Sequence, residues 1–165
     1  SPDKLRWGYA CAKLMTEFMI KASTFPSVII RFFNVVGPGQ SGEYGMVLPR
    51  FISAVNTDKS IVVYGDGKQV RSFCHVKDAV VALRLLEGEE GTYNVGNDSP
   101  TTIVDLAISV IQTAKVKCRV EFRKYEQDFS DQHGDIMNRV PDISKLRKLG
   151  YEPQYNLMDI IKDML

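Results

Sequence analysis

Residues 28–33 read Val28-Ile29-Ile30-Arg31-Phe32-Phe33, a nearly continuous apolar run with the length of one β-strand. Apolar residues at consecutive positions face both sides of a sheet, so this pattern predicts a strand that is covered on both faces, as in the middle of a parallel sheet. No other segment of the sequence shows the same signature. The run therefore predicts an α/β fold in which this strand needs neighbouring strands.

The residues on either side of this strand predict helices and strands in alternation, as in α/β proteins. An amphipathic helix is expected first, because apolar residues recur at helical spacing between residues 7 and 22. The sequence further predicts helices at 46–56, 78–87 and 103–113, two short helices from 143 and from 157, and strands at 91–95 and 120–122. Thr101 or Thr102 is expected to cap the helix that follows it.

Two further strands, at residues 60–64 and 68–75, are predicted to form a hairpin around Gly65-Asp66-Gly67. Glycine supplies the positive backbone angles that such tight turns require. Because the chain opens on a helix beside a central strand, we expect roughly one domain, about 100–200 residues, to be absent upstream.

The composition is that of an ordinary globular protein, with 44% hydrophobic and 25% charged residues. The formal charge of +1 argues against binding to nucleic acid or to an anionic membrane. The sequence contains no secretory segment and no apolar run long enough to span a bilayer, so a cytoplasmic location is expected. Cys11, Cys74 and Cys118 lack metal-ligand spacing and are interpreted as free thiols, buried or unreactive; no metal site is predicted.

Tyr9 and Lys13 lie four residues apart, and therefore on one face of the first predicted helix. A neighbouring cation stabilises a phenolate, so this tyrosine could take the proton from a sugar hydroxyl while hydride leaves the carbon. The same spacing occurs in Tyr64 and Lys68, where two intervening glycines oppose a helix. The spacing alone thus fits a half-buried tyrosine and a solvated lysine equally well.

A series of motifs follows the Tyr-Lys pair. In chain order, these motifs are Ile30 to Gly39, Val62 to Gly67, Gln69 to Asp78, Tyr93 to Gly96, Asp142 to Lys145 and Leu149 to Pro153. Together with Tyr9 to Lys13, this order resembles the extended short-chain dehydrogenase/reductase family, specifically its NAD-dependent nucleotide-sugar epimerases, dehydratases and decarboxylases.

The resemblance implies the C-terminal portion of a Rossmann-type enzyme with a small α/β substrate-binding domain. Residues 1–36 would be a remnant of the NAD-binding domain, and residues 37–165 would be mainly the nucleotide-sugar-binding domain. The N-terminal dinucleotide-binding half is expected to be absent, since no Gly-rich phosphate loop stands between a strand and a helix. Binding of the cofactor NAD would be incomplete, and the partner would be the missing half or a self-associating copy, with a homodimer expected.

For the chemistry, the resemblance makes Tyr9 the catalytic base and gives Lys13 two roles, tuning that base and binding the nicotinamide ribose. Phe32 and the backbone of Val35 would lie near the nicotinamide. Phe32 taken singly is also a typical sheet-core residue.

For the substrate, the resemblance places Asn34 and Arg71 at the diphosphate, Val47 and Leu48 along the nucleoside pocket, and Tyr64 against the base. A guanidinium suits the diphosphate because its forked donors match phosphate oxygens. Singly, each residue also has a structural interpretation, Asn34 as a turn residue and Arg71 as a solvated charge on a strand.

Two positions bear on these expectations. Gln132 stands where the family usually has a second arginine for the diphosphate, and Arg139 lies nearby. His75 stands where the family has a histidine that orders the junction between hairpin and helix, so a structural role is expected. Two functions follow: part of a nucleotide-sugar epimerase or dehydratase that is inactive without its N-terminal half, or a non-catalytic module that binds a nucleotide sugar or a partner through Asn34, Tyr64 and Arg71.

Overall fold

The apolar run identified in the sequence forms strand β1 (Val28–Phe32), which pairs in parallel with β6 (Gly91–Val95). The computed structural model describes residues 6–42, 46–124 and 136–165, and within these ranges β1 has no partner on its other edge. Exposure rises along the strand, from 8% at Ile29 to 49% at Phe32. In the described part of the chain, the start of β1 is covered, with Ile29 buried and Val28 and Ile30 packed on a hydrophobic cluster, while its carboxyl end is open. The expected further neighbour of the strand stays a prediction.

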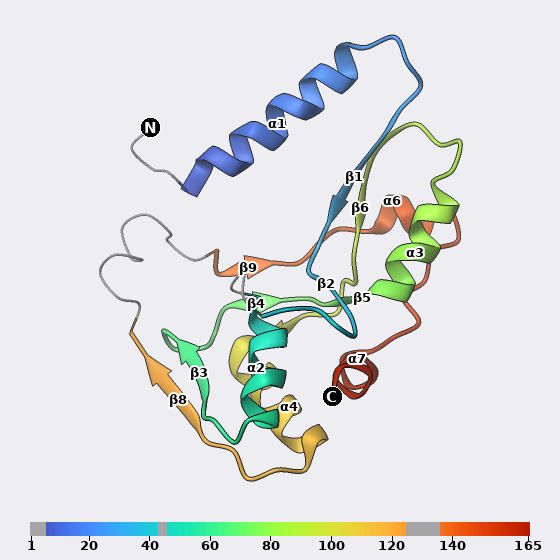
Figure 1. Ribbon diagram of the computed structural model, residues 1–165. Coiled ribbons are helices and arrows are strands. Elements are labelled where there is room, and N and C mark those ends of the chain that lie inside the picture. Colours follow the sequence, from blue (N-terminus) through green and yellow to red (C-terminus); the bar gives the residue numbers. More distant parts are fainter. Residues whose placement is uncertain (1–5, 43–45, 125–135) are drawn as a thin grey trace.

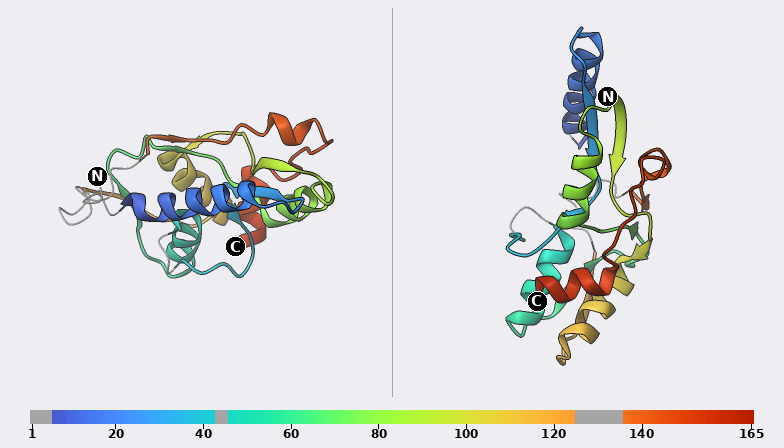
Figure 2. Two further views of the ribbon diagram at one scale, coloured as in Figure 1. Left: turned by 90° about the horizontal axis from the view of Figure 1, so that it is seen from above. Right: turned by 90° about the vertical axis from the view of Figure 1, so that its right-hand side faces the viewer.

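Helix α1 (Arg6–Ala22) precedes β1 and runs antiparallel to it, so the amino end of the helix lies on the same side as the carboxyl end of the strand (Figure 1). The right view of Figure 2 shows α1 at one extremity of the molecule, above the other described elements. Its apolar side chains are solvent-exposed as a result: Leu14, Met15, Phe18 and Met19 each show 50–68% of their surface. This helix was predicted correctly, and most of its apolar face is exposed in the described part of the chain.

One hydrophobic core lies between the β1–β6 pair and two helices, α3 (Val76–Leu85) and α6 (Ser144–Arg147). Tyr93 and Val95 of β6 point into this core, where they meet Ala82 of α3 and Leu146 of α6, all buried. Burial of this apolar surface stabilises the pairing of β1 with β6.

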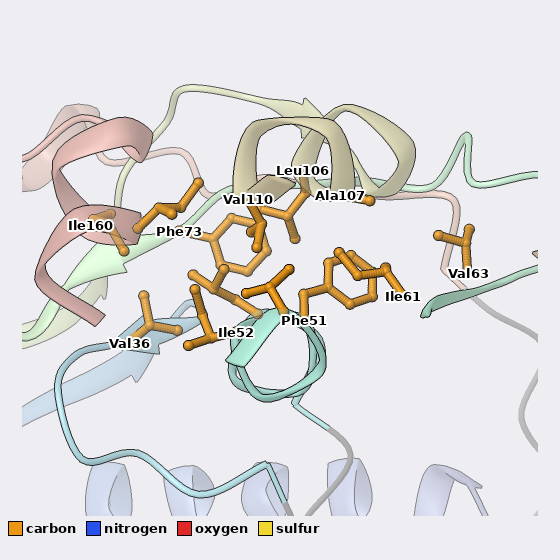
Figure 3. Packing of buried hydrophobic residues seen from close by; sticks show 13 residues of the cluster. Val36, Phe51, Ile52, Ile61, Val63, Phe73, Leu106, Ala107, Val110 and Ile160 are labelled. Carbon is orange, nitrogen blue, oxygen red and sulfur yellow. The ribbon is translucent and has the colours of Figure 1, made fainter. Parts of the chain in front are cut away.

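A second, larger core is built from α2 (Val47–Asn56), α4 (Ile103–Ala114), α7 (Leu157–Met164) and strand β3 (Ile61–Tyr64). Figure 3 shows Phe51 and Ile52 of α2 facing Leu106 and Val110 of α4. Ile160 of α7 closes the same cluster. The structure thus has two packing units, and the chain passes between them several times.

The predicted hairpin of residues 60–75 is wrong. Strand β3 pairs in parallel with β8 (Val120–Arg123), and the following segment is divided into β4 (Val70–Arg71) and β5 (Cys74–His75). Strand β5 pairs with β2 (Val35–Val36), while β4 lies between β7 (Thr101–Thr102) and β9 (Asn138–Arg139).

The glycine turn itself is present, since Gly65 and Gly67 have φ values of 70° and 71°. A tight turn specifies a reversal but not a strand partner. The backbone amide of Val104 binds the carbonyl of Gly67, and that of Ile103 binds the carbonyl of Gln69, so the start of α4 takes the place that a hairpin partner would have. The turn signal was therefore interpreted correctly and the pairing was not.

Local capping agrees with the sequence at two places. The Thr102 hydroxyl accepts a hydrogen bond from the Asp105 amide at the start of α4, as predicted. His75 caps α3 by accepting from the amide of Lys77, which confirms its expected structural role. No helix in the described ranges is long and apolar enough to cross a membrane.

Candidate functional site

Tyr9 and Lys13 share one face of α1, as their spacing predicted. The Lys13 ammonium lies 5.6 Å from the centroid of the Tyr9 ring, and 75% of Tyr9 is exposed. At this distance the cation and the aromatic ring attract one another. The pair is thus preassembled on an open helix face, where a phenol oxygen can reach a bound molecule.

A two-point ion pair links α1 to β1. The guanidinium of Arg31 donates from Nε to Glu17 Oε1 at 2.7 Å and from Nη2 to Oε2 at 2.5 Å. This hydrogen-bonded cation lowers the pKa of the Glu17 carboxyl below its ordinary value. The pair fixes α1, and Tyr9 with it, relative to the sheet.

We expect Glu17→Gln to loosen α1. Because the folded-state pKa of Glu17 is lowered, its contribution is present at neutral pH and is lost as the pH falls through that lowered pKa. An exposed pair of this kind is worth at most about 1 kcal/mol, so amide protection of α1 should fall roughly two- to fivefold at pH 7. Protection factors from hydrogen exchange between pH 7 and pH 3 measure this.

As the solution becomes acidic, the amide protection of α1 in the wild-type chain should fall to that of Glu17→Gln. The matched control is the charge-swapped double variant Glu17→Arg with Arg31→Glu, which should regain part of the protection. Equal protection of α1 in wild type and Glu17→Gln at pH 7 would show that the pair does not hold the helix.

Asn34 lies in the short connection between β1 and β2. Its φ of 41° is a left-handed conformation, which asparagine tolerates better than most residues. Its side-chain amide donates to the carbonyl of Ser72 at 2.7 Å, and its own carbonyl accepts from the Cys74 amide at 3.1 Å. Asn34 therefore joins the end of β1 to the segment between β4 and β5. The turn interpretation of this residue is confirmed; its predicted contact with a diphosphate stays a prediction.

Arg71 and Arg139 are paired in register on neighbouring strands, β4 and β9. Residues paired in this way project to the same face of a sheet, so the two arginines extend from neighbouring positions on one face. Arg71 Nη1 donates to the carbonyl oxygens of Val70 at 2.8 Å and Ile136 at 2.6 Å, which orients its guanidinium. The guanidinium carbon of Arg139 lies 5.8 Å from the centroid of the Phe33 ring.

These contacts gather two cations next to Phe33 and Asn34, at the carboxyl end of β1. This is the kind of place where parallel α/β sheets bind ligands. Two guanidinium groups here can bind an anion with at least two charged oxygen atoms, such as a diphosphate. The sequence placed Arg139 only near this region, because strand pairing across 68 residues leaves no local signal.

Tyr64 lies at the end of β3 and is half-buried. The guanidinium carbon of Arg50, from the first turn of α2, lies 5.7 Å from the centroid of the Tyr64 ring. A shallow cavity of about 450 Å³ begins beside Arg50. It is lined by Ser41, Gly42, Arg50, Phe51, Ser53, Ala54, Thr57, Lys59, Ser60 and Val62. The sequence analysis missed both Arg50 and this cavity.

The two residues predicted to line a nucleoside pocket differ in their positions. Val47 is partly exposed at the start of α2, whereas Leu48 is fully buried in the larger core. In a helix, adjacent residues point about 100° apart, so one of them faces the core. The side chain of Leu48 thus faces the larger core, and the predicted place of Val47 and Leu48 at a nucleoside pocket stays a prediction.

Phe32 and Val35, predicted to lie near a nicotinamide, flank Asn34. Phe32 is half-exposed at the end of β1 and offers an apolar surface to the open side of the strand. Val35 pairs with Cys74, and its carbonyl accepts from Gln40 Nε2 at 3.3 Å. The placement of Phe32 suits a flat ring, while the carbonyl of Val35 already has a side-chain partner.

The thiols offer no nucleophile with a special environment. Cys74 is fully buried, and burial raises the pKa of its thiol to about 11, so it stays protonated and unreactive, as expected. Cys11 is exposed on α1 and Cys118 is partly exposed, so Cys74 is the buried one of the three thiols. Across the described ranges, no group of three or more potential metal ligands comes together. Gln132 and His133 lie outside the described residues.

Comparison with known proteins gives the same family as the motifs. Residues 1–96 match the family described as "NAD dependent epimerase/dehydratase family". The chain is 40% identical over 153 residues to UDP-glucuronic acid decarboxylase 2 of Arabidopsis thaliana, covering 91% of this chain and 33% of that protein. It is 33% identical over 154 residues to UDP-N-acetyl-alpha-D-glucosaminuronate decarboxylase of Bacillus cytotoxicus, covering 89% of this chain and 48% of that protein.

A solved structure shares the fold. It is UDP-N-acetylglucosamine 4-epimerase from Methanobrevibacter ruminantium M1, in complex with UDP-N-acetylmuramic acid, with a TM-score of 0.77 and 30% identity. The similarity covers 93% of this chain and 50% of the epimerase. The chain thus spans half or less of the length of these relatives. With its Tyr-Lys helix, its parallel strands and this family match, the chain belongs to the NAD-dependent epimerase/dehydratase family, within the extended short-chain dehydrogenases/reductases.

Proposed function

We propose that this chain is the nucleotide-sugar-binding part of an NAD-dependent enzyme in which hydride leaves a sugar carbon while Tyr9 takes the hydroxyl proton. The observation that carries the proposal is the pairing of Tyr9 and Lys13 on one exposed face of α1. The product of this step is a transient ketosugar, which then epimerises, dehydrates or decarboxylates. We propose that the chain is inactive without an N-terminal half that completes the cofactor site.

The substrate we propose is a UDP-linked uronic acid. Support comes from the relatives at 33–40% identity, which are named decarboxylases of UDP-glucuronic acid and of UDP-N-acetylglucosaminuronate. Arg71 and Arg139, adjacent on β4 and β9, supply two cations for its diphosphate. Arg139 would thereby take the role that a family arginine has at the position of Gln132.

The fit to NAD is partial. Lys13 and Tyr9 can hold a ribose hydroxyl, and the half-exposed ring of Phe32 offers an apolar surface for the nicotinamide. Glycines 37, 39 and 42 lie between the two-residue strand β2 and α2, and Gly42 packs against Arg50. We propose that the Gly-rich turn that cradles the NAD pyrophosphate is a different one and belongs to the N-terminal half. When bound, NAD supplies a hydride acceptor; the residues of this chain hold the sugar, orient it and take its proton.

The open sides of α1 and β1 support the proposal that another segment completes this structure. An apolar helix face and an unpaired strand edge both favour association. We propose that the missing N-terminal half covers them, and that the completed protein is a cytoplasmic homodimer. Residues 1–36, with β6, would then belong to the NAD-binding domain, and the remaining residues mainly to the substrate-binding domain.

The direct test is reconstitution. The chain is produced together with the N-terminal half of a family member, and conversion of UDP-glucuronic acid is followed by NMR of the sugar products. We expect turnover by the reconstituted protein and none by the 165-residue chain. Binding of UDP-glucuronic acid without turnover, in a complex that also binds NAD, would favour the non-catalytic binding module instead.

We expect the chain alone to bind NAD weakly. It offers a contact to the ribose but no backbone cradle for the pyrophosphate, whose charge-assisted hydrogen bonds are the strongest that a dinucleotide makes. Isothermal calorimetry with the purified chain should therefore detect no binding tighter than about 1 mM, roughly 4 kcal/mol. Micromolar binding by the chain alone would contradict the proposal that the phosphate site lies in a separate half.

A further inference from the structure

His75 is a fully buried ionisable residue to which the proposed chemistry assigns no task. Both nitrogens of its ring are used. Nδ1 accepts a hydrogen bond from the Lys77 amide at 3.0 Å, and Nε2 lies 2.9 Å from Oδ2 of Asp163. Asp163 lies on the last helix, 88 residues further along the chain.

The two contacts determine where the ring carries its proton. An amide N–H can only donate, so Nδ1 must be the unprotonated nitrogen of the ring. Nε2 then carries the hydrogen and donates it to the Asp163 carboxylate. The neutral Nε2–H form satisfies both contacts at once, whereas the other neutral form satisfies neither.

We propose that Asp163 is a positioning residue that holds the His75 ring through Nε2–H, keeps Nδ1 directed at the Lys77 amide, and so ties the C-terminal helix α7 to the start of α3. A buried N–H without a partner destabilises the folded state, so an acceptor at Nε2 stabilises this position of the ring. The His75 contact is also the main cause that lowers the pKa of Asp163, in agreement with a carboxylate that accepts a hydrogen bond in the folded state.

The groups around this contact support a defined position for the ring. The Tyr155 ring stacks on His75 at 4.1 Å, with an angle of 18° between the planes. Lys77 Nζ lies 3.4 Å from Asp163 Oδ2 and 5.4 Å from the Tyr155 ring. The buried carboxylate of Asp78 accepts from the amides of Gln154 and Tyr155 at 3.1 and 3.2 Å.

The hydrogen bond between His75 and Asp163 connects the two hydrophobic cores. Helix α7 contributes Ile160 and Ile161 to the larger core, and α3 contributes Ala79 and Ala82 to the smaller one. The His75–Asp163 contact joins the two helices directly. It lies four residues beyond Arg71, at the end of the segment that carries that cation.

NMR of the 165-residue chain at pH 7 tests the proposal. The sequence has two histidines, and His75→Gln identifies the ring signals of His75. We expect wild type to show a neutral ring with hydrogen on Nε2, a slowly exchanging Nε2–H signal, and a protected Lys77 amide. Asp163→Ala should lose the Nε2–H signal and raise the exchange rate of the Lys77 amide about fivefold or more, which corresponds to the loss of one helix cap.

Two variants separate this role from simpler ones. Asp163→Asn retains a side-chain oxygen that can accept, so it should keep the Nε2–H signal and most of the protection even if Asp163→Ala does not fold. Lys77→Met removes the ammonium beside Asp163 but leaves the backbone amide, and it should resemble wild type. Hydrogen on Nδ1 in the wild-type ring would overturn the proposal. So would an unchanged Nε2–H signal in Asp163→Ala, or a Lys77→Met variant that loses that signal.

Discussion

Replacing Tyr9 by phenylalanine in the protein completed by its N-terminal half is expected to lower kcat by about 10²–10⁴-fold. The change removes the proton acceptor and preserves the aromatic ring, so affinity for the nucleotide sugar should change by less than roughly threefold, as for an interaction used mainly in the transition state. Steady-state kinetics and equilibrium binding of the same variant separate the two effects.

Lys13→Met is the companion variant. It takes away the cation that lies 5.6 Å from the Tyr9 ring and keeps a side chain of similar length. We expect it to lower turnover as Tyr9→Phe does, and to move the pH profile of turnover to higher pH, because the phenolate loses a stabilising charge. If Tyr9→Phe retained wild-type turnover, Tyr9 would not be the base.

Arg71→Ala should have the opposite pattern. A charge-assisted contact with a phosphate is expected to be worth about 2–4 kcal/mol, so affinity for the nucleotide sugar should fall roughly 30-fold to several-hundred-fold. Turnover at saturating substrate should stay within about fivefold of wild type, since Arg71 binds a part of the substrate remote from the reacting carbon. Calorimetry with UDP and saturation kinetics measure the two quantities.

Two controls sharpen the test of Arg71. Arg71→Lys keeps the positive charge but lacks the paired N–H donors of a guanidinium, so it should recover only part of the affinity for the nucleotide sugar. Arg139→Ala should weaken binding in the same direction, because Arg139 is paired with Arg71 on the neighbouring strand. Equal losses of affinity and of turnover in Tyr9→Phe and Arg71→Ala would remove the basis for separating a base from a binding residue.

The sequence predicted those parts of the fold that local patterns determine. The periodicity of α1, the apolar run of β1 and the cap at Thr102 each depend on residues within a few positions of one another. His75 was also assigned correctly to structure, although its partner Asp163 was not found. A hydrogen bond between residues 88 positions apart leaves no periodic signal in a single sequence.

The wrong prediction of the hairpin and the positions of Leu48 and Arg139, which the sequence did not reveal, share a physical cause, which is competition among distant partners. Glycines at 65 and 67 specify a turn, yet β3 pairs with β8 because the start of α4 occupies the hairpin position. Leu48 and Val47 are neighbours in sequence, and only the packing of α2 on α4 decides which of them is buried. The position of Arg139 beside Arg71 likewise depends on the pairing of β4 with β9, which no local sequence pattern predicts.

The proposed hydride transfer can be observed directly by the absorbance of reduced nicotinamide in a stopped-flow instrument. The completed protein, carrying NAD, is mixed with UDP-glucuronic acid, and the reduced cofactor is followed during the first turnover. Our account predicts a transient rise in wild type that is slowed about 10²-fold or more in Tyr9→Phe and persists in Arg71→Ala at saturating substrate. Substrate turnover by the wild-type protein with no reduced nicotinamide at any time would contradict it.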